Sequence, residues 1–204
     1  GYIESVNKYM ERDLKEDDLD VLRKIGSFCQ FTGWYSITIE ILKCTYNIHK
    51  KILGEQHLKT INSVFILGKS LMVNGAYSET DILYQKTLKI CEQSYGYENR
   101  VTLRALSQLG LLLRKKGDYR EAKNIYSKVL KISESVFGSD HPRTLIAINA
   151  MGFVLRDLGN YEEAVVLYRK LVDLGFHVFG HEHSNTLTYF CLLYTSDAAD
   201  DSLR

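Results

Sequence analysis

The stretch that decides the fold is residues 138–170, which read GSDHPRTLIAINAMGFVLRDLGNYEEAVVLYRK. Its apolar residues fall in two blocks, and Gly159 with Asn160 separates them. Apolar residues three and four positions apart share one face of a helix. Gly and Asn both tolerate the left-handed conformation that closes a helix. The stretch therefore predicts two helices, the first capped by Thr144 and the second running over 161–179.

The same pattern recurs along the chain every 42 residues. The columns in register, which contain no insertion, are Gly54, Gly96, Gly138 and Gly180; Gly33, Gly75, Gly117 and Gly159; Gly26, Gly68, Gly110 and Gly152; Tyr35, Tyr77, Tyr119 and Tyr161; and, in the linkers, His57, Asn99, His141 and His183. A glycine inside a helix costs about 1 kcal/mol relative to alanine, so the Gly152 column predicts a close helix–helix contact. Because neither helix of a pair buries its apolar stripe alone, stacked pairs must form the core.

The spacing from Gly152 through Gly159, Tyr161 and Ala164 to Tyr168 resembles the tetratricopeptide repeat (TPR) signature. A period of 42 residues resembles the longer variant found in kinesin light chains. The resemblance implies an all-α fold, a right-handed superhelical solenoid of antiparallel helix pairs. HEAT or armadillo repeats have a similar period, but they do not explain the Gly, Tyr and Ala columns. Thr38 and Thr80 stand where later copies have alanine, so the first two copies are divergent.

The columns predict a domain organisation. Residues 1–17 end a preceding repeat helix and its linker, and the array over 18–193 divides into copies at about 18–53, 54–95, 96–137 and 138–179, with a partial copy over 180–193. Residues 194–204 lack the repeat pattern and resemble translated library-adapter sequence, with a native acidic tail as the alternative. We therefore expect the chain to be a fragment of a longer array.

Composition argues against several classes of protein. The 204 residues carry 26 Lys and Arg and 25 Asp and Glu, a formal net charge of +1, whereas nucleic-acid-binding domains usually have a large basic excess. No apolar run approaches the length of a membrane span, and the N-terminus has no secretory signal. The four cysteines are widely spaced, which favours free thiols in a reducing compartment. We therefore expect a cytoplasmic protein with no nucleic-acid partner and no membrane insertion.

Candidate catalytic groups are scarce. The sequence has no zinc-protease, P-loop or nucleophile-elbow motif, and we expect neither an enzyme nor a cofactor. His181 and His183, with Cys191 as a further ligand, form the one metal-site alternative. His183 belongs to the linker column, however, so a structural role in capping or packing the turn is favoured over metal binding.

The TPR resemblance implies that the first helix of each copy lines a concave groove. The inward candidates are Asn62, Phe65, Lys69 and Met72; Arg104, Ser107, Leu111 and Arg114; Ile146, Asn149, Phe153 and Arg156; and, in the first pair, Arg23, Ser27 and Gln30. Apolar anchors mixed with basic residues suit an extended peptide with bulky apolar and acidic side chains. Kinesin light chains use a groove rich in asparagine for aromatic-acidic cargo peptides, whereas only Asn62 and Asn149 fall on this lining.

The sequence thus predicts a non-enzymatic scaffold that binds partner peptides, with a cargo adaptor in a motor complex as its kinesin-light-chain-like form. Two alternatives stay open. One is the sensing or regulatory tail of a larger nucleotide-dependent switch protein, and the other is a metal-binding or enzymatic domain around His181 and His183.

Overall fold

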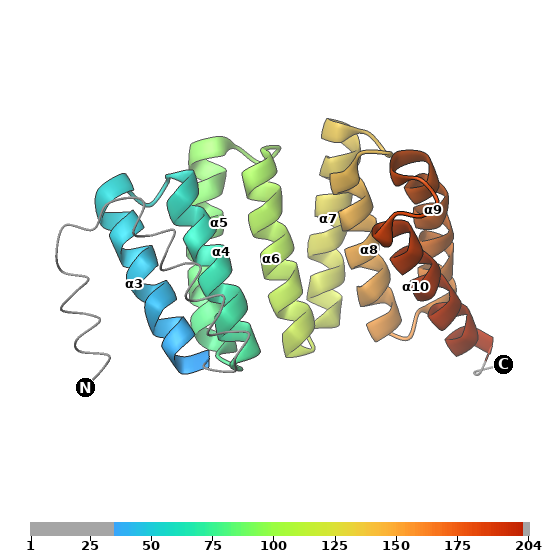
Figure 1. Ribbon diagram of the computed structural model, residues 1–204, viewed down its shortest axis with the longest axis horizontal. Coiled ribbons are helices and arrows are strands. Elements are labelled where there is room, and N and C mark those ends of the chain that lie inside the picture. Colours follow the sequence, from blue (N-terminus) through green and yellow to red (C-terminus); the bar gives the residue numbers. More distant parts are fainter. Residues whose placement is uncertain (1–34, 202–204) are drawn as a thin grey trace. The chain divides into compact units, whose positions relative to one another are not determined.

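The computed structural model describes residues 35–201, and this range contains eight helices and no strand (Figure 1). The helices are α3 (Tyr35–Leu53), α4 (Leu58–Val73), α5 (Tyr77–Tyr95), α6 (Arg100–Lys116), α7 (Tyr119–Phe137), α8 (Pro142–Asp157), α9 (Tyr161–Phe179) and α10 (Ser184–Asp201). The predicted helix end over 1–17 and the groove candidates Arg23, Ser27 and Gln30 lie outside the described residues. None of the helices in the described range combines the length and apolar character needed to cross a bilayer.

The chain divides into two compact units, with the division after Gly96. In the first unit, α3 packs against α4 and α4 against α5. In the second unit, α6, α7, α8 and α9 each pack against the next helix along the chain. The order of packing follows the order of the chain, as expected of an all-α helical solenoid built from repeated pairs.

Helix bounds repeat with the predicted period. The helices α3, α5, α7 and α9 all begin at the tyrosine column and are 19 residues long. The predicted second helix over 161–179 is confirmed as α9. Gly117 closes α6 in the left-handed region, with φ +89°, and Gly159 also has a positive φ of +78°. Asn160 has φ −84°, so the prediction that it shares the left-handed turn is wrong.

The residue that caps α8 is His141 and not Thr144. The Nδ1 atom of His141 accepts a hydrogen bond of 3.2 Å from the backbone N–H of Arg143. The same arrangement recurs at His57 and His183, while Asn99 uses its Oδ1 atom. The linker column is therefore a column of N-caps, each of which satisfies one free N–H at a helix start. Its structural role, predicted for His183, is confirmed.

Thr144 instead ties the start of α8 to the end of α7. Its buried hydroxyl donates to the carbonyl oxygens of Gly138, at 2.7 Å, and Ser133, at 3.3 Å. Thr186 makes the equivalent bonds to Gly180 and Gly175. A threonine at the third position of the helix therefore fixes the linker by bonding to the carbonyl of the glycine that closes the preceding helix and to a carbonyl in the last turns of that helix.

The recurring glycine inside the first helix of each pair contacts a tyrosine of the second helix. A Cβ atom added at Gly110 would lie 2.9 Å from Cζ of Tyr126, and one added at Gly152 would lie 2.7 Å from Cζ of Tyr168. Gly68 and Tyr84 form the same pair in the first unit. The predicted close approach is confirmed, and the tyrosine column is what fills the space.

The last helix departs from this pattern. Tyr189 occupies the column of Ala105 and Ala147, and it packs against Gly175 of α9. Residues 194–201 continue α10 as helix. There Ser196 is fully buried with an unpaired hydroxyl, in the column where α8 buries Val154. The helix thus continues through a segment whose side chains do not follow the repeat.

Candidate functional site

Four of the groove candidates lie on α4, in the first unit. Asn62 and Lys69 are exposed. Phe65 is only 1% exposed and packs edge-on against Tyr84, with ring centroids 6.2 Å apart. Its side chain belongs to the core of the first unit, so Phe65 does not present an apolar anchor to a ligand. Met72 is also buried.

The second unit carries two matching rows of candidates. The row on α6 is Arg104, Ser107, Leu111 and Arg114, and the row on α8 is Ile146, Asn149, Phe153 and Arg156. All eight side chains are exposed or half-buried. Because each row follows a spacing of three, four and three residues, it lies along one face of its helix. We call these two rows the α6/α8 face.

An open cavity of about 340 Å³ lies at the N-terminal end of this face. Its walls come from α6, α7 and α8, and the lining residues are Leu103, Arg104, Ser107, Gln108, Val129, Ser133, Phe137, Arg143, Ile146 and Ala147. The structure therefore brings Arg104, Ser107 and Ile146 together, as three of the residues predicted to line a groove. The volume is enough for a large apolar side chain.

The cavity combines an apolar floor with positive charge at its rim. Val129 and Ala147 are buried, while Ile146 is 63% exposed. The guanidinium of Arg143 lies 6.0 Å from the ring centroid of Phe137. Within the described residues, Arg143 has no acidic partner. The site is therefore suited to an apolar group with a neighbouring anion.

At the other end of the face, two arginines converge on one aromatic ring. The guanidinium of Arg114 lies 4.8 Å from the ring centroid of Phe153, and that of Arg156 lies 5.2 Å from it. Nε of Arg114 also donates to a carboxylate oxygen of Asp157, the last residue of α8. Arg156 has no acidic partner among the described residues. Cation–π contacts of this kind hold guanidinium groups in place at a surface.

Two buried polar atoms next to the face have no partner among the described residues. They are Oδ1 of Asn149 and the hydroxyl of Tyr168. In the preceding pair, the hydroxyl of Tyr126 donates to the carbonyl oxygen of Ser107 at 3.1 Å. A buried acceptor without a donor costs about 1–3 kcal/mol. Both atoms have almost no solvent-accessible surface, so their missing bonds are a cost to stability and not contacts open to a ligand.

Burial and charge shift the tyrosine pKa values near the face. Burial raises the pKa of Tyr126 to about 12, and the nearby Arg114 opposes that shift. Burial also raises the pKa of Tyr168 to about 12, while Arg156 and Arg114 oppose the shift and Asp157 adds to it. Both phenols therefore stay protonated and neutral at physiological pH, and the charge at the face comes from the arginines and Asp157.

The metal-site alternative does not match the placement of its residues. Nδ1 of His183 accepts the N–H of Asn185 at 3.1 Å, and its ring stacks on Phe179. The ring of His181 lies 4.2 Å from that of Phe176. Among the described residues, no three His, Cys, Asp or Glu side chains are grouped so that they could hold a metal ion.

The sequence patterns did not predict three residues of the candidate site. Arg143 and Phe137 lie near the linker, outside the rows of the groove pattern, and reach the cavity from its edge. Asp157 directly follows the predicted Arg156 and pairs with Arg114. The 42-residue columns set Asp157 apart, because the equivalent residues in the two preceding copies are Val73 and Lys115, neither of which is acidic.

Comparison with solved structures supports the fold. TPR-like repeats of a candidate kinesin light chain from Podosopora anserina match with a TM-score of 0.75 and 22% identity, over 91% of this chain and 87% of that one. BtubC (BKLC) from P. vanneervenii matches with a TM-score of 0.75 and 13% identity, over 98% and 80%. The apo form of RapI matches with a TM-score of 0.63 and 13% identity, over 97% and 75%. At these identities the likeness concerns the fold alone.

Sequence comparison places the chain in a family. No curated protein sequence matches it. The family model of the tetratricopeptide repeat matches residues 64–135 and 102–175, which together span more than half of the chain. Those matches contain the glycine–tyrosine pairs of the second unit and both rows of the α6/α8 face. The chain therefore belongs to the tetratricopeptide repeat family, whose fold is that of a protein-interaction scaffold.

Proposed function

We propose that this protein is a non-enzymatic scaffold that binds an extended segment of a partner protein along the α6/α8 face. The segment would carry an apolar, preferably aromatic, side chain flanked by acidic residues. The observation that carries the proposal is the cavity of about 340 Å³, in which an apolar floor meets Arg104 and Arg143 at the rim.

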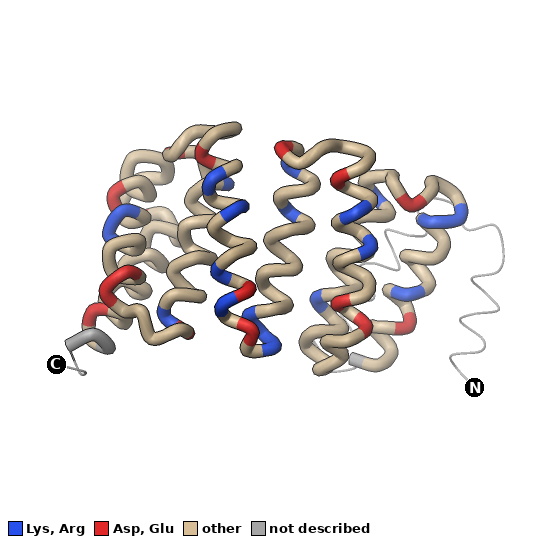
Figure 2. Tube along the Cα trace, turned by 180° about the vertical axis from the view of Figure 1, so that it is seen from behind, with Lys and Arg blue, Asp and Glu red and all other residues tan. Residues whose placement is uncertain are grey.

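Charge along the face supports an acidic ligand. Three of its eight residues are arginines, none is acidic, and Arg143 adds a further positive charge at the cavity. Arg156 and Arg143 have no acidic partner within the described residues. Figure 2 shows basic and acidic residues interspersed over the helices of each unit. Complementary charge speeds association and fixes the register of a bound segment.

Apolar and polar groups along the face support an extended conformation of the ligand. The cavity accepts one apolar side chain, and the half-exposed Leu111 and Phe153 provide further contact area. A segment in extended conformation can reach both ends of the face with few residues, because it spans about 3.3 Å per residue. Asn62 and Lys69 stay candidate contacts on the first unit.

The experiment is a binding titration of fluorescent peptides, followed by anisotropy at low and high salt. One peptide carries an aromatic residue flanked by glutamates, and a matched peptide has glutamine in place of each glutamate. We expect the acidic peptide to bind more tightly, with an affinity that falls as salt rises. Phe153→Ala should weaken its binding about fivefold or more, since truncating an anchor of this kind costs more than about 1 kcal/mol.

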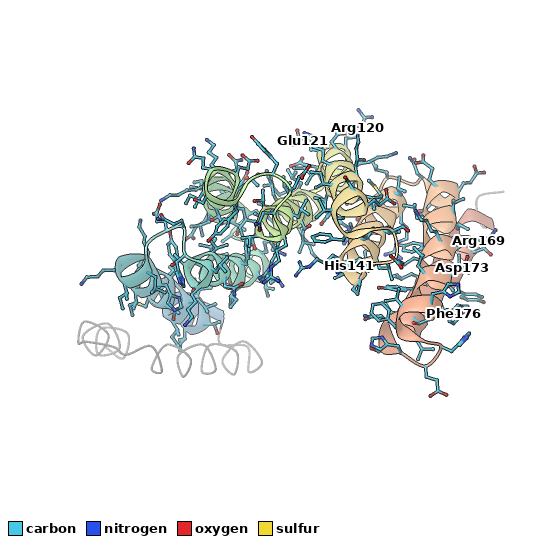
Figure 3. All side chains as sticks on the ribbon, turned by 90° about the horizontal axis from the view of Figure 1, so that it is seen from above. Arg120, Glu121, His141, Arg169, Asp173 and Phe176 are labelled. Carbon is cyan, nitrogen blue, oxygen red and sulfur yellow. The ribbon has the colours of Figure 1, made fainter. Side chains whose placement is uncertain are left out.

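A matched pair of variants tests the position of the charge. Arg143→Gln removes a charge from the cavity, whereas Arg120→Gln removes the same charge from the start of α7 (Figure 3). Only Arg143→Gln should reduce the affinity for the acidic peptide and its salt dependence. Equal effects of the two variants, or no binding by a folded protein, would contradict the proposal.

A cytoplasmic cargo adaptor in a motor complex is the cellular form of this proposal. It is supported by the 42-residue period and by the likeness to repeats of a candidate kinesin light chain. This is tested by precipitating the full-length protein from cell extract and probing the precipitate for a motor heavy chain by immunoblot. Absence of the heavy chain from a precipitate that retains peptide binding would exclude the motor role and leave the scaffold role in place.

A further inference from the structure

The ion pair between Arg114 and Asp157 is the part of the α6/α8 face that the repeat does not explain. Arg114 and Arg156 occupy one column, so an arginine at this position recurs. Asp157 occupies a column that holds Val73 in α4 and the exposed Lys115 in α6. The carboxylate therefore belongs to one copy only, and the packing of a helix pair does not depend on it.

The ion pair engages the guanidinium group of Arg114, which is the group that would bind a ligand carboxylate. Nε of Arg114 donates to the Asp157 carboxylate, and its guanidinium lies over Phe153. The two side chains remain 23% and 22% exposed, so both are accessible from solvent. A ligand carboxylate that approaches Arg114 meets a guanidinium already bonded to an anion, and it is repelled by that anion. Arg156, whose guanidinium also lies over the Phe153 ring, has no acidic partner among the described residues.

We propose that Asp157 is an intramolecular competitor of the acidic ligand, which masks Arg114 and lowers the affinity of the face until a ligand carboxylate displaces it. The inference rests on the proposed function, because it concerns the same face and an acidic segment. It makes Asp157 a residue that sets affinity and selects for ligands with enough negative charge to replace it.

The test is the affinity of Asp157→Asn for the acidic peptide and for its glutamine-substituted match. Asparagine keeps the shape and an acceptor oxygen but removes the charge. We expect the affinity for the acidic peptide to rise about fivefold, on the scale of one partly exposed ion pair, while the affinity for the neutral peptide stays unchanged. Asp173→Asn is the matched control, since it removes an exposed carboxylate from α9 (Figure 3) and should change neither affinity.

A double-mutant cycle tests the route through Arg114. In an Arg114→Gln background, Asp157→Asn should give no gain, because the arginine that it unmasks is absent. A gain that persists in this background would show that Asp157 acts only as a general negative charge, and it would overturn the masking of Arg114.

A purely structural ion pair predicts a different result. In that case Asp157→Asn lowers the free energy of unfolding and leaves the affinity for the acidic peptide unchanged or weaker. This result would overturn the inference. The proposed function would still stand, provided that the wild-type protein binds the peptide. If the folded wild-type protein and the variant both fail to bind the acidic peptide, the proposed function fails and the inference fails with it. The denaturant midpoint of each variant, measured beside the titration, separates these outcomes.

Discussion

Gly152 and Tyr168 form a complementary pair, in which the glycine of α8 leaves the space that the tyrosine ring of α9 fills. A Cβ at Gly152 would lie 2.7 Å from Cε1 and Cζ of that ring. The ring is fully buried, so it has little room to move aside. This relationship recurs at Gly110 with Tyr126, and it explains why a residue that weakens helices stands inside the first helix of each of these pairs.

Gly152→Ala should therefore destabilise the protein by up to about 2 kcal/mol. Overpacking costs about 1–3 kcal/mol, and the higher helix propensity of alanine offsets about 1 kcal/mol of that cost. Urea denaturation followed by circular dichroism measures the change. The same substitution in a Tyr168→Leu background, which frees the space, should cost at least about 1 kcal/mol less. An equal cost in both backgrounds would show that the ring does not constrain position 152.

Two buried threonines in one column should respond in opposite ways to valine. Thr144→Val removes hydrogen bonds to the carbonyl oxygens of Gly138 and Ser133, and it should cost about 1–3 kcal/mol because the Gly138 carbonyl in the linker loses its partner. The hydroxyl of Thr60 is buried without a partner, so Thr60→Val should be neutral or stabilising. Thermal unfolding of the two variants checks the contrast. Equal losses would refute the assignment of the linker bonds to Thr144.

Stability should fall as pH rises from about 10 towards about 12. Burial raises the pKa of Tyr126 to about 12, whereas a phenol in the unfolded chain titrates near about 10. In this window the unfolded state releases a proton that the folded state keeps, so the stabilisation is complete below about pH 10 and is lost on the way to about pH 12. A shift of this size corresponds to about 2–3 kcal/mol.

Denaturant unfolding at about pH 9 and about pH 11.5 measures this loss. Tyr126→Phe should reduce the difference between the two pH values, since it removes the phenol that titrates. Tyr97→Phe, which removes a phenol that is 64% exposed, serves as the control. The account fails at this point if the Tyr126 variant loses as much stability as the wild-type protein.

The fold follows from the sequence because its determinants are local and repeated. A positive φ at Gly117 and Gly159 fixes where first helices end, and the tyrosine two residues later begins the next helix. The N-cap was harder to assign, since Thr144 and His141 both stand near the start of α8 and both side chains offer an acceptor. Only the placed backbone shows that Nδ1 of His141 faces the free N–H, while Thr144 faces back towards α7.

The candidate site follows from the sequence only in part, because exposure depends on neighbours that periodicity does not identify. Phe65 and Phe153 both lie edge-on to a tyrosine of the second helix, yet Phe65 is buried and Phe153 is half-buried. The ion pair of Arg114 with Asp157 joins residues 43 positions apart. A repeat pattern predicts what each copy shares, whereas this contact depends on a carboxylate that a single copy carries.

The central claim is that a partner segment binds on the α6/α8 face, and site-specific photo-crosslinking tests it most directly. A photoreactive residue replaces Ile146 at the cavity or, as a matched control, Val166 on α9; the two positions are 63% and 65% exposed. With the acidic aromatic peptide at saturation, the account predicts crosslinking at position 146 and little at position 166. Crosslinking at 166 that equals or exceeds that at 146, from protein that binds the peptide, would contradict it.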